Sequence, residues 1–142
     1  MVSSPDYNPN ILNRSEFDIP LAESSLDEAP FFNRAISGSY PPASTIKPFI
    51  GLLGLEEKII DASTIIEDVG FFQLKEDGRR YRGWKEDGHG KVNLEKAIVE
   101  SSDVFFYELS SKLTIDRISS FLAKFGFGVT TGIELLTETE SI

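Results

Sequence analysis

The pattern of apolar and polar positions changes at about residue 44. Residues 1–43 are rich in Pro, Asn, Ser, Asp and Glu and contain only short apolar pieces, which indicates extended segments and loops. After them, apolar side chains recur at helical spacing and predict a helix over about 44–57. Pro48 lacks the N–H that would bond back to the carbonyl of Ser44, so this helix must begin in the turn just before Pro48. The pattern therefore places Ser44 at the helix N-terminus.

Further helices are predicted in the last third of the chain. Asn93 is a typical N-cap for the segment LEKAIVE, and after the polar residues 101–103 the apolar pattern resumes in VFFYELSSKL. Thr114 can cap a third helix in this region. Residues 61–90 carry glycines among aromatic residues, which is typical of irregular or hairpin structure. We therefore expect a mainly helical region from residue 44 onward.

Size and composition exclude several classes of protein. A chain of 142 residues with 40% apolar residues and 11 Phe can bury one core, which predicts one domain or part of one. Its net charge of -9 would repel a phosphate backbone, so nucleic acid is not an expected partner. There is no Cys, and hence neither a disulfide nor a thiolate metal site. The apolar stretch over 48–55 is far shorter than the roughly 20 residues of a membrane span, and the N-terminus shows no export signal.

Ser44 and Lys47 form an S-x-x-K pattern at the head of the segment PFIGLLGL, whose apolar surface on nearly all sides predicts a buried helix. Side chains three residues apart on a helix share a face, so this hydroxyl and amine can share a proton. Burial lowers the pKa of a lysine, which would let Lys47 act as a base on a serine nucleophile. One S-x-x-K is also about what chance supplies in a chain with 16 Ser and 8 Lys. The pattern alone leaves open whether Ser44 is a nucleophile or an ordinary N-cap.

Four ordered segments carry a resemblance to a known family, and they read YPPASTIKPF, RRYRGWKEDGHG, ESSDVFFYEL and FGFGVTTGIEL. In this order and at these distances they closely resemble the transpeptidase domain of penicillin-binding protein 2, a class B enzyme of bacterial cell elongation, over essentially the whole chain. The resemblance implies an α+β fold of the penicillin-binding protein and serine β-lactamase type. Residues 1–142 would be an incomplete, mainly α-helical part of that domain, with a lead-in of loops over 1–43 and the helical part over 44–142.

The resemblance also implies roles for four residues. Ser44 would be the acylated nucleophile, and Lys47 would be its general base. Ser101, in the second serine motif, would pass a proton toward the leaving amine, and Asp103 stands where many relatives carry Asn. The backbone N–H of Ser44 would supply one arm of an oxyanion hole.

The protein implied by the resemblance is a serine-type D,D-transpeptidase that cross-links peptidoglycan stem peptides and reacts with β-lactam antibiotics. Its expected partners are proteins of the elongation machinery, and its expected location is the periplasmic face of the bacterial inner membrane. Membrane contact is expected only through an N-terminal anchor that this sequence does not contain. No cofactor is expected.

Some members of the family hold a zinc ion near this site with two aspartates, a histidine and a cysteine. Asp68 and His89 match two of these positions, whereas Gly83 and Ser102 fall where the other aspartate and the cysteine would be. Two ligands do not make a zinc site, so we expect no zinc and a structural role for His89.

No K-[ST]-G segment occurs in the sequence, although in the family that strand closes the cleft and gives the second oxyanion donor. Loss of one such donor costs roughly 2.7–4 kcal/mol of transition-state stabilisation, so the chain on its own is expected to be poorly active. Two other interpretations stay open. One is a non-catalytic binding or scaffold fragment of the same fold, and the other is an unrelated Ser/Lys hydrolase.

Overall fold

The computed structural model describes residues 33–74 and 78–133. The chain divides into two compact units, one formed by residues 1–41 together with 128–142 and the other by residues 42–127.

In the first unit, the described residues form one short helix, α1 (Arg34–Ser37). It begins at Asn33, whose side chain accepts a hydrogen bond from the N–H of Ala35 at 3.2 Å. Asn is a favoured N-cap because its side-chain oxygen satisfies one of the free N–H groups of the first turn.

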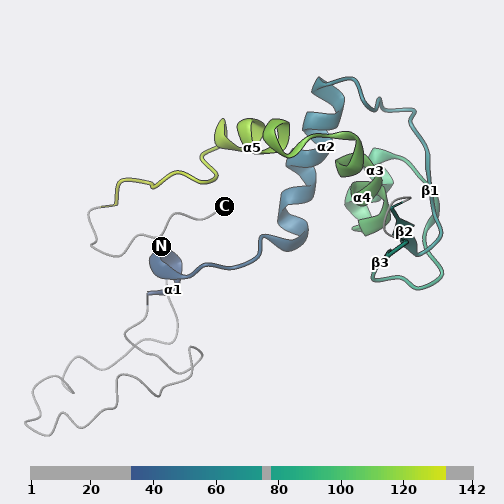
Figure 1. Cartoon of the computed structure of the whole chain (residues 1–142), viewed down its shortest axis with the longest axis horizontal. Helices are drawn as coiled ribbons and strands as arrows, with labels where there is room; N and C mark the ends of the chain where they lie inside the picture. The colour runs from purple at the N-terminus through teal and green to yellow at the C-terminus, as the bar shows by residue number, and fades with distance from the viewer. Residues whose placement is uncertain (1–32, 75–77, 134–142) are drawn as a thin grey trace, which may run out of the picture. The chain divides into compact units, whose positions relative to one another are not determined.

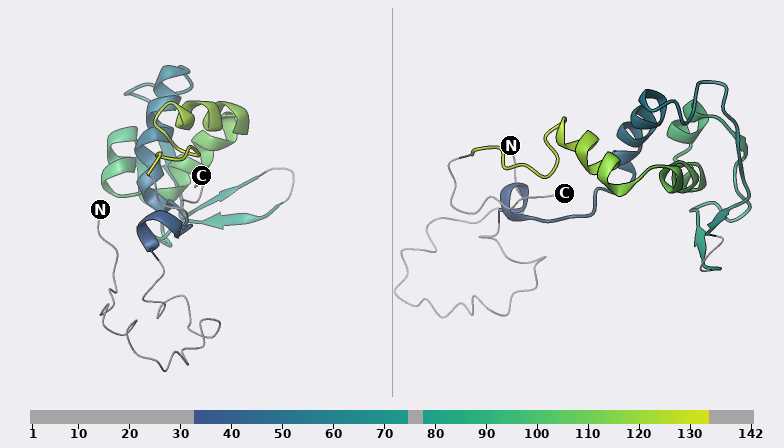
Figure 2. Two further views of the ribbon diagram at one scale, coloured as in Figure 1. Left: turned by 90° about the vertical axis from the view of Figure 1, so that its left-hand side faces the viewer. Right: turned by 45° about the horizontal axis from the view of Figure 1, so that its top comes forward.

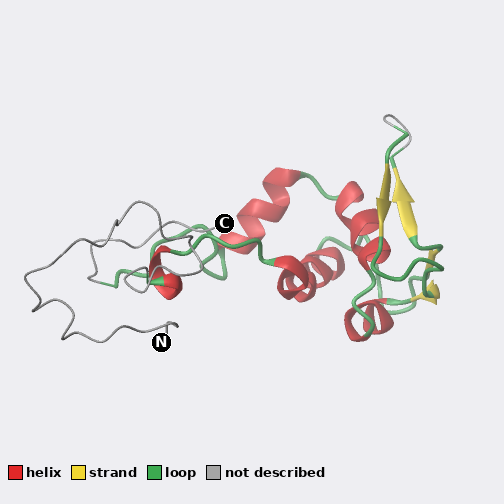
Figure 3. Ribbon diagram, turned by 90° about the horizontal axis from the view of Figure 1, so that it is seen from below, coloured by secondary structure: helices red, strands yellow, loops and turns green. Residues whose placement is uncertain are grey.

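The second unit carries all the other helices and strands of the described residues (Figures 1 and 3). None of the described helices has the length and apolar character needed to cross a bilayer. In chain order the elements are η2 (Ala43–Ile46), α2 (Lys47–Glu56), β1 (Ile66–Asp68), β2 (Phe71–Gln73), β3 (Arg80–Arg82), β4 (Gly90–Val92), α3 (Leu94–Val99), α4 (Asp103–Lys112) and α5 (Ile115–Ala123).

The strands pair in two small antiparallel sheets within the region predicted to be irregular or hairpin structure. β1 pairs with β4, so that Ile66 lies opposite Val92. β2 pairs with β3 as a hairpin, with Phe72 opposite Tyr81. Ile66 and Val92 are buried, and the first sheet therefore presents one face to the core.

The helix predicted over 44–57 is present, with a difference at its start. Residues Ala43–Ile46 form a 3-10 turn, and the α-helix runs from Lys47 to Glu56. Pro48 lies in the first turn of α2, where its missing N–H would have had no partner within the helix. Neither the turn nor α2 has a side-chain cap, so the interpretation of Ser44 as a simple N-cap is wrong.

Three polar side chains cap the remaining helices of the second unit. Asn93 caps α3, Ser102 caps α4 and Thr114 caps α5, each by accepting a hydrogen bond from the backbone N–H three residues further on. The sequence predicted Asn93 and Thr114 in this role. Ser102 was not predicted as a cap, and its hydroxyl also donates a hydrogen bond to Asp68 Oδ2.

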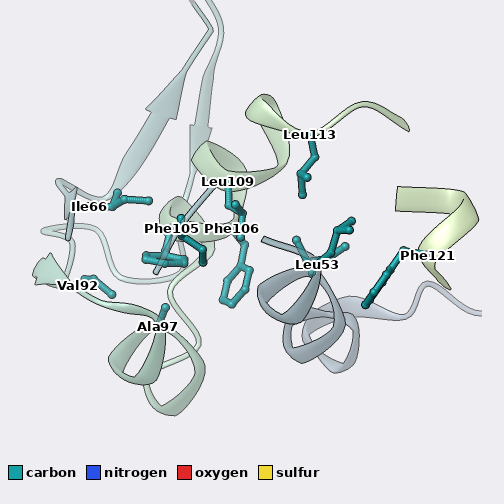
Figure 4. Packing of buried hydrophobic residues seen from close by; sticks show 11 residues of the cluster. Leu53, Ile66, Val92, Ala97, Phe105, Phe106, Leu109, Leu113 and Phe121 are labelled. Atoms are coloured by element: carbon teal, nitrogen blue, oxygen red, sulfur yellow. The ribbon is translucent and has the colours of Figure 1, made fainter. Parts of the chain in front are cut away.

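The hydrophobic core lies where α2, α3, α4 and the β1–β4 sheet meet, and Figure 4 shows its packing. α2 contacts α3, α4 and α5 and lies among them in Figure 2. Burial of α2 is less complete than predicted, because Leu52 is 46% and Leu55 38% exposed while the opposite face is buried. The buried residues of the core cluster are Ile50, Leu53, Ile60, Ile66, Val92, Ala97, Phe105, Phe106, Leu109, Leu113 and Phe121.

Candidate active site

Ser44 lies in the 3-10 turn that leads into α2, with its side chain exposed. The residue before it, Ala43, has a φ of 48°, in the left-handed region that residues other than glycine rarely adopt. The N–H of Lys47 then closes the turn by donating to the carbonyl of Ser44. Backbone strain of this kind is often found at functional sites, and here it directly precedes the candidate nucleophile.

Lys47 begins α2, and its side chain is only 10% exposed. Its Nζ lies 2.8 Å from the carbonyl oxygen of Ser101, 3.0 Å from Ser101 Oγ and 2.7 Å from Asp103 Oδ1. These three acceptors match the three N–H donors of an ammonium group. The ring of Phe106 also faces the amine, with its centroid 5.7 Å from Nζ. The buried amine is thus fully paired in this arrangement.

Ser101 connects Ser44 to Lys47. Its Oγ lies 3.0 Å from Ser44 Oγ and 3.0 Å from Lys47 Nζ. In the part of the chain that the structure describes, Lys47 Nζ makes no hydrogen bond directly to Ser44 Oγ. A proton can therefore pass between the amine and the candidate nucleophile through the hydroxyl of Ser101.

Asp103 is held from two sides. Oδ1 accepts the hydrogen bond of Lys47, and Oδ2 accepts one from the backbone N–H of Trp84 at 3.1 Å. Asp103 is also the first residue of α4, where the helix dipole favours a carboxylate. Two causes raise the pKa of Tyr107 above its usual value of 10.0. The larger is burial, and the smaller is the negative charge of Asp103.

A pocket of about 380 Å³ opens beside these residues. One part of its lining is polar, from Ser44, Lys47 and Asp103, and another is apolar, from Ile50 and Phe106. This combination of a few convergent polar groups with apolar walls is typical of sites for small ligands and peptide ends. The full lining comprises Ala43, Ser44, Ile46, Lys47, Ile50, Asp103, Phe106, Tyr107 and Ser110.

The structure brings together the four residues that the sequence singled out, Ser44, Lys47, Ser101 and Asp103. The expected direct sharing of a proton between Ser44 and Lys47 is replaced by a contact through Ser101. Sequence reasoning missed Trp84 as a backbone donor to Asp103, because a main-chain contact between residues 19 positions apart leaves no pattern of side-chain types.

A second network of polar side chains is buried next to the 101–103 segment. Oδ2 of Asp68, at the end of β1, accepts a hydrogen bond from Ser102 Oγ at 2.7 Å and lies 2.6 Å from Nδ1 of His89. The other oxygen, Oδ1, accepts one from the N–H of Gly70 at 2.9 Å. Burial raises the pKa of Asp68, but the hydrogen bonds from Ser102, His89 and Gly70 outweigh it and hold the pKa below its usual range.

This network does not offer the zinc ligands found in some members of the family that the sequence resembles. Asp68 and His89 are in contact, but Gly83 has no side chain and the Ser102 hydroxyl is used as a donor to Asp68. Over residues 33–74 and 78–133, no group of three or more His, Cys, Asp or Glu residues could hold a metal ion. The donor set therefore does not fit zinc.

The comparison with protein families decides the relationship. Residues 1–142 match the family described as the penicillin binding protein transpeptidase domain. The chain belongs to this family. The resemblance inferred from the four segments is thereby confirmed, and so is the α+β penicillin-binding protein fold.

Individual relatives of this transpeptidase-family chain agree with the match. It is 42% identical over 144 residues to the peptidoglycan D,D-transpeptidase MrdA of Acinetobacter baumannii, and the alignment covers 100% of this chain and 21% of that protein. A crystal structure of Pseudomonas aeruginosa PBP2 in complex with WCK 5153 is 38% identical, with a TM-score of 0.84 over 99% of this chain and 32% of that chain. Helicobacter pylori PBP2, solved in a complex with MreC, is 38% identical with a TM-score of 0.73 over 80% of this chain and 21% of that one. The chain thus spans about a fifth of the length of the MrdA protein that it matches.

Proposed function

We propose that this chain is part of a serine-type D,D-transpeptidase that cross-links peptidoglycan stem peptides through an acyl-enzyme on Ser44. The observation that carries the proposal is the hydrogen-bonded chain from Ser44 Oγ through Ser101 Oγ to Lys47 Nζ, at the edge of a pocket. It supplies a nucleophile, a proton relay and a proton acceptor in contact with one another, which acyl transfer requires. The chain's relatives of 38% to 43% identity that are named peptidoglycan D,D-transpeptidase MrdA support the substrate class.

In the acylation step, Ser44 Oγ attacks the carbonyl carbon of the penultimate residue of a D-Ala-D-Ala stem peptide. The hydroxyl proton passes to neutral Lys47 by way of Ser101, a C–O bond forms, and the C–N bond to the terminal D-alanine then breaks. The same proton returns through Ser101 to the leaving amine. The backbone N–H of Ser44 is one donor to the developing oxyanion.

The three acceptors around Lys47 Nζ support a role for this amine as the group that returns a proton to the leaving amine. Three acceptors surround Lys47 Nζ, so the amine must release one hydrogen bond and lose a proton before it can act as a base. Asp103 pairs with the ammonium form.

In the second half of the reaction, the amine of another stem peptide attacks the ester carbon. A proton of this amine passes to Ser44 Oγ as the C–O bond breaks.

The same site would react with β-lactam antibiotics, because opening of the lactam ring leaves an ester on Ser44. We extend to this chain two further properties of the class: proteins of the elongation machinery as partners, and a location at the periplasmic face of the inner membrane. The complex of Helicobacter pylori PBP2 with MreC supports the first of these. The sequence contains no K-[ST]-G segment, so the isolated chain is expected to be poorly active.

Labelling with a fluorescent penicillin tests the proposal in the full-length natural protein. We expect covalent label on the wild type, none on Ser44→Ala, and wild-type labelling of the control Ser120→Ala, which alters an exposed serine on α5. A well-folded wild type that takes up no label would contradict the proposal and favour the scaffold interpretation. Label from simple activated esters but not from penicillin would instead indicate a Ser/Lys hydrolase that acts on other substrates within the same fold.

A further inference from the structure

The reaction described above makes no use of the buried Asp68–His89–Ser102 network. Asp68 is 2% exposed, His89 8% and Ser102 0%, so removing these polar groups from water must be offset by their mutual hydrogen bonds. A carboxylate can only accept hydrogen bonds, so Nδ1 of His89 carries the proton that faces Asp68 Oδ2. Nε2 of His89 is buried without a hydrogen-bond partner among the described residues, 3.8 Å from a carboxylate oxygen of Glu100. Among the described residues the imidazole is therefore hydrogen-bonded through Nδ1 alone, and its ring also packs edge-on against Trp84, with ring centroids 5.3 Å apart.

Ser102 connects this hydrogen-bonded network to the second serine motif. Its hydroxyl donates to Asp68 Oδ2 at 2.7 Å and accepts the N–H of Phe105 in the first turn of α4 at 3.3 Å. Its own N–H donates to the carbonyl of Ala97 in α3 at 2.9 Å. Both the side chain and the backbone of Ser102 are thus fixed.

Ser101 precedes this fixed residue and has a φ of 53°. Residues other than glycine adopt this left-handed conformation at a cost, and it persists only where the surrounding structure enforces it. In this conformation both the carbonyl and the hydroxyl of Ser101 contact Lys47 Nζ. Whatever holds Ser102 therefore also holds the proton relay.

We propose that His89 and Asp68 are positioning residues, which hold Ser102 and so keep the left-handed backbone of Ser101 with its hydroxyl between Ser44 and Lys47. Neither side chain is proposed to touch the substrate. The kinetic part of this inference rests on the proposed transpeptidase function, whereas its structural part does not.

The test uses two substitutions that break the network from opposite ends, in the full-length protein. His89→Leu removes the donor to Asp68 at nearly constant volume, and Ser102→Ala removes the hydroxyl at the other end. A displacement of reacting groups by about 1 Å can cost up to about 100-fold in rate. We expect each variant to lower the rate constant of acylation by saturating fluorescent penicillin by about 10- to 100-fold, with the prior non-covalent affinity changed less than about threefold. The double variant should be no slower than the slower single one, since both act through one link.

Two controls separate positioning from loss of stability. His89→Asn places an amide N–H near the position of Nδ1, so it should restore acylation to within about threefold of wild type. Leu122→Ala truncates a buried side chain of α5 and should destabilise the fold while leaving the acylation rate unchanged.

Crystal structures of the wild type and of His89→Leu give a readout that needs no activity. The proposal expects Ser101 to leave its left-handed conformation in the variant and its hydroxyl to lose contact with Lys47. An unchanged Ser101 in the variant, or wild-type acylation by both His89→Leu and Ser102→Ala, would overturn it. If the wild type itself takes up no label, the proposed function fails, and the two crystal structures alone then decide the positioning role.

Discussion

At the scale of the residue, the amine of Lys47 is the group on which the proposed chemistry depends most. Arg is always protonated in proteins and cannot take the proton of Ser44. General bases contribute about 10²- to 10⁴-fold to rate, so Lys47→Arg should slow acylation by penicillin by about that factor. The measurement is the rate of fluorescent labelling in the full-length protein. Lys112→Arg, which alters the exposed partner of Glu108 on α4, serves as the control, and an undiminished rate in Lys47→Arg would rule out the base role.

Tyr107 reports on the charge of Asp103. Burial is the larger cause of its raised pKa, and the negative charge of Asp103 is the smaller. A negative charge opposes formation of the tyrosinate, so Asp103→Asn should lower the pKa of Tyr107 while leaving it above 10.0. Titration of the ¹³Cζ resonance of Tyr107 measures this shift. A pKa that is the same in the variant and the wild type would show that Asp103 does not act on the pocket as a charge.

At the scale of the element, the sequence predicted the helix starts that depend on local signals. Asn93 and Thr114 are favoured N-caps followed by apolar residues at helical spacing, and both begin helices where expected. The placement of Ser101 between Ser44 and Lys47 could not be predicted in the same way. It depends on a left-handed residue and on contacts between positions 54 and 57 apart, for which the sequence holds no periodic signal. The sequence therefore singled out four residues that lie together in the structure, but it did not predict that Ser101 links Ser44 to Lys47.

The turn before β4 and the first residue of β4 offer a matched pair of glycine substitutions. Gly88 and Gly90 both have positive φ, of 73° and 67°. A Cβ at Gly88 would collide with the backbone at Asp68 and Gly70, whereas a Cβ at Gly90 would meet no atom within 4 Å. Gly90→Ala should cost only the backbone term of roughly 1–2 kcal/mol. Gly88→Ala should cost more than about 3 kcal/mol, because the loop that carries His89 must also shift.

Denaturant unfolding of the two variants beside the wild type checks this prediction. Equal losses of unfolding free energy would mean that the loop moves away from β1 without penalty. A larger loss of unfolding free energy in Gly90→Ala than in Gly88→Ala would mean that Gly88 does not lie close to the backbone of Asp68.

At the scale of the whole molecule, the second unit assembles the serine, the lysine and the relay from η2, α2 and the α3–α4 junction. Chain segments about 55 positions apart meet because α2 packs against α3 and α4 over the shared apolar core. The chain covers 32% of the Pseudomonas aeruginosa PBP2 chain, and its sequence contains no K-[ST]-G segment. The groups that we propose to break and form bonds thus lie in one unit, while a second donor to the oxyanion is expected from outside it.

This division predicts how the isolated chain of 142 residues behaves beside the full-length protein. Removing one oxyanion donor costs roughly 10²- to 10³-fold in rate, so the isolated chain should be acylated by penicillin at least about 100-fold more slowly. Its residual labelling should still require Ser44, since the hydrogen-bonded relay lies within η2, α2 and the 101–103 segment. Time courses of fluorescent labelling for both proteins, each with its Ser44→Ala variant, make the comparison, and circular dichroism establishes that the isolated chain is helical. Equal acylation rates would contradict this prediction. They would show that the 142 residues already supply the second donor to the oxyanion, because the remainder of the full-length protein would then add nothing to the rate.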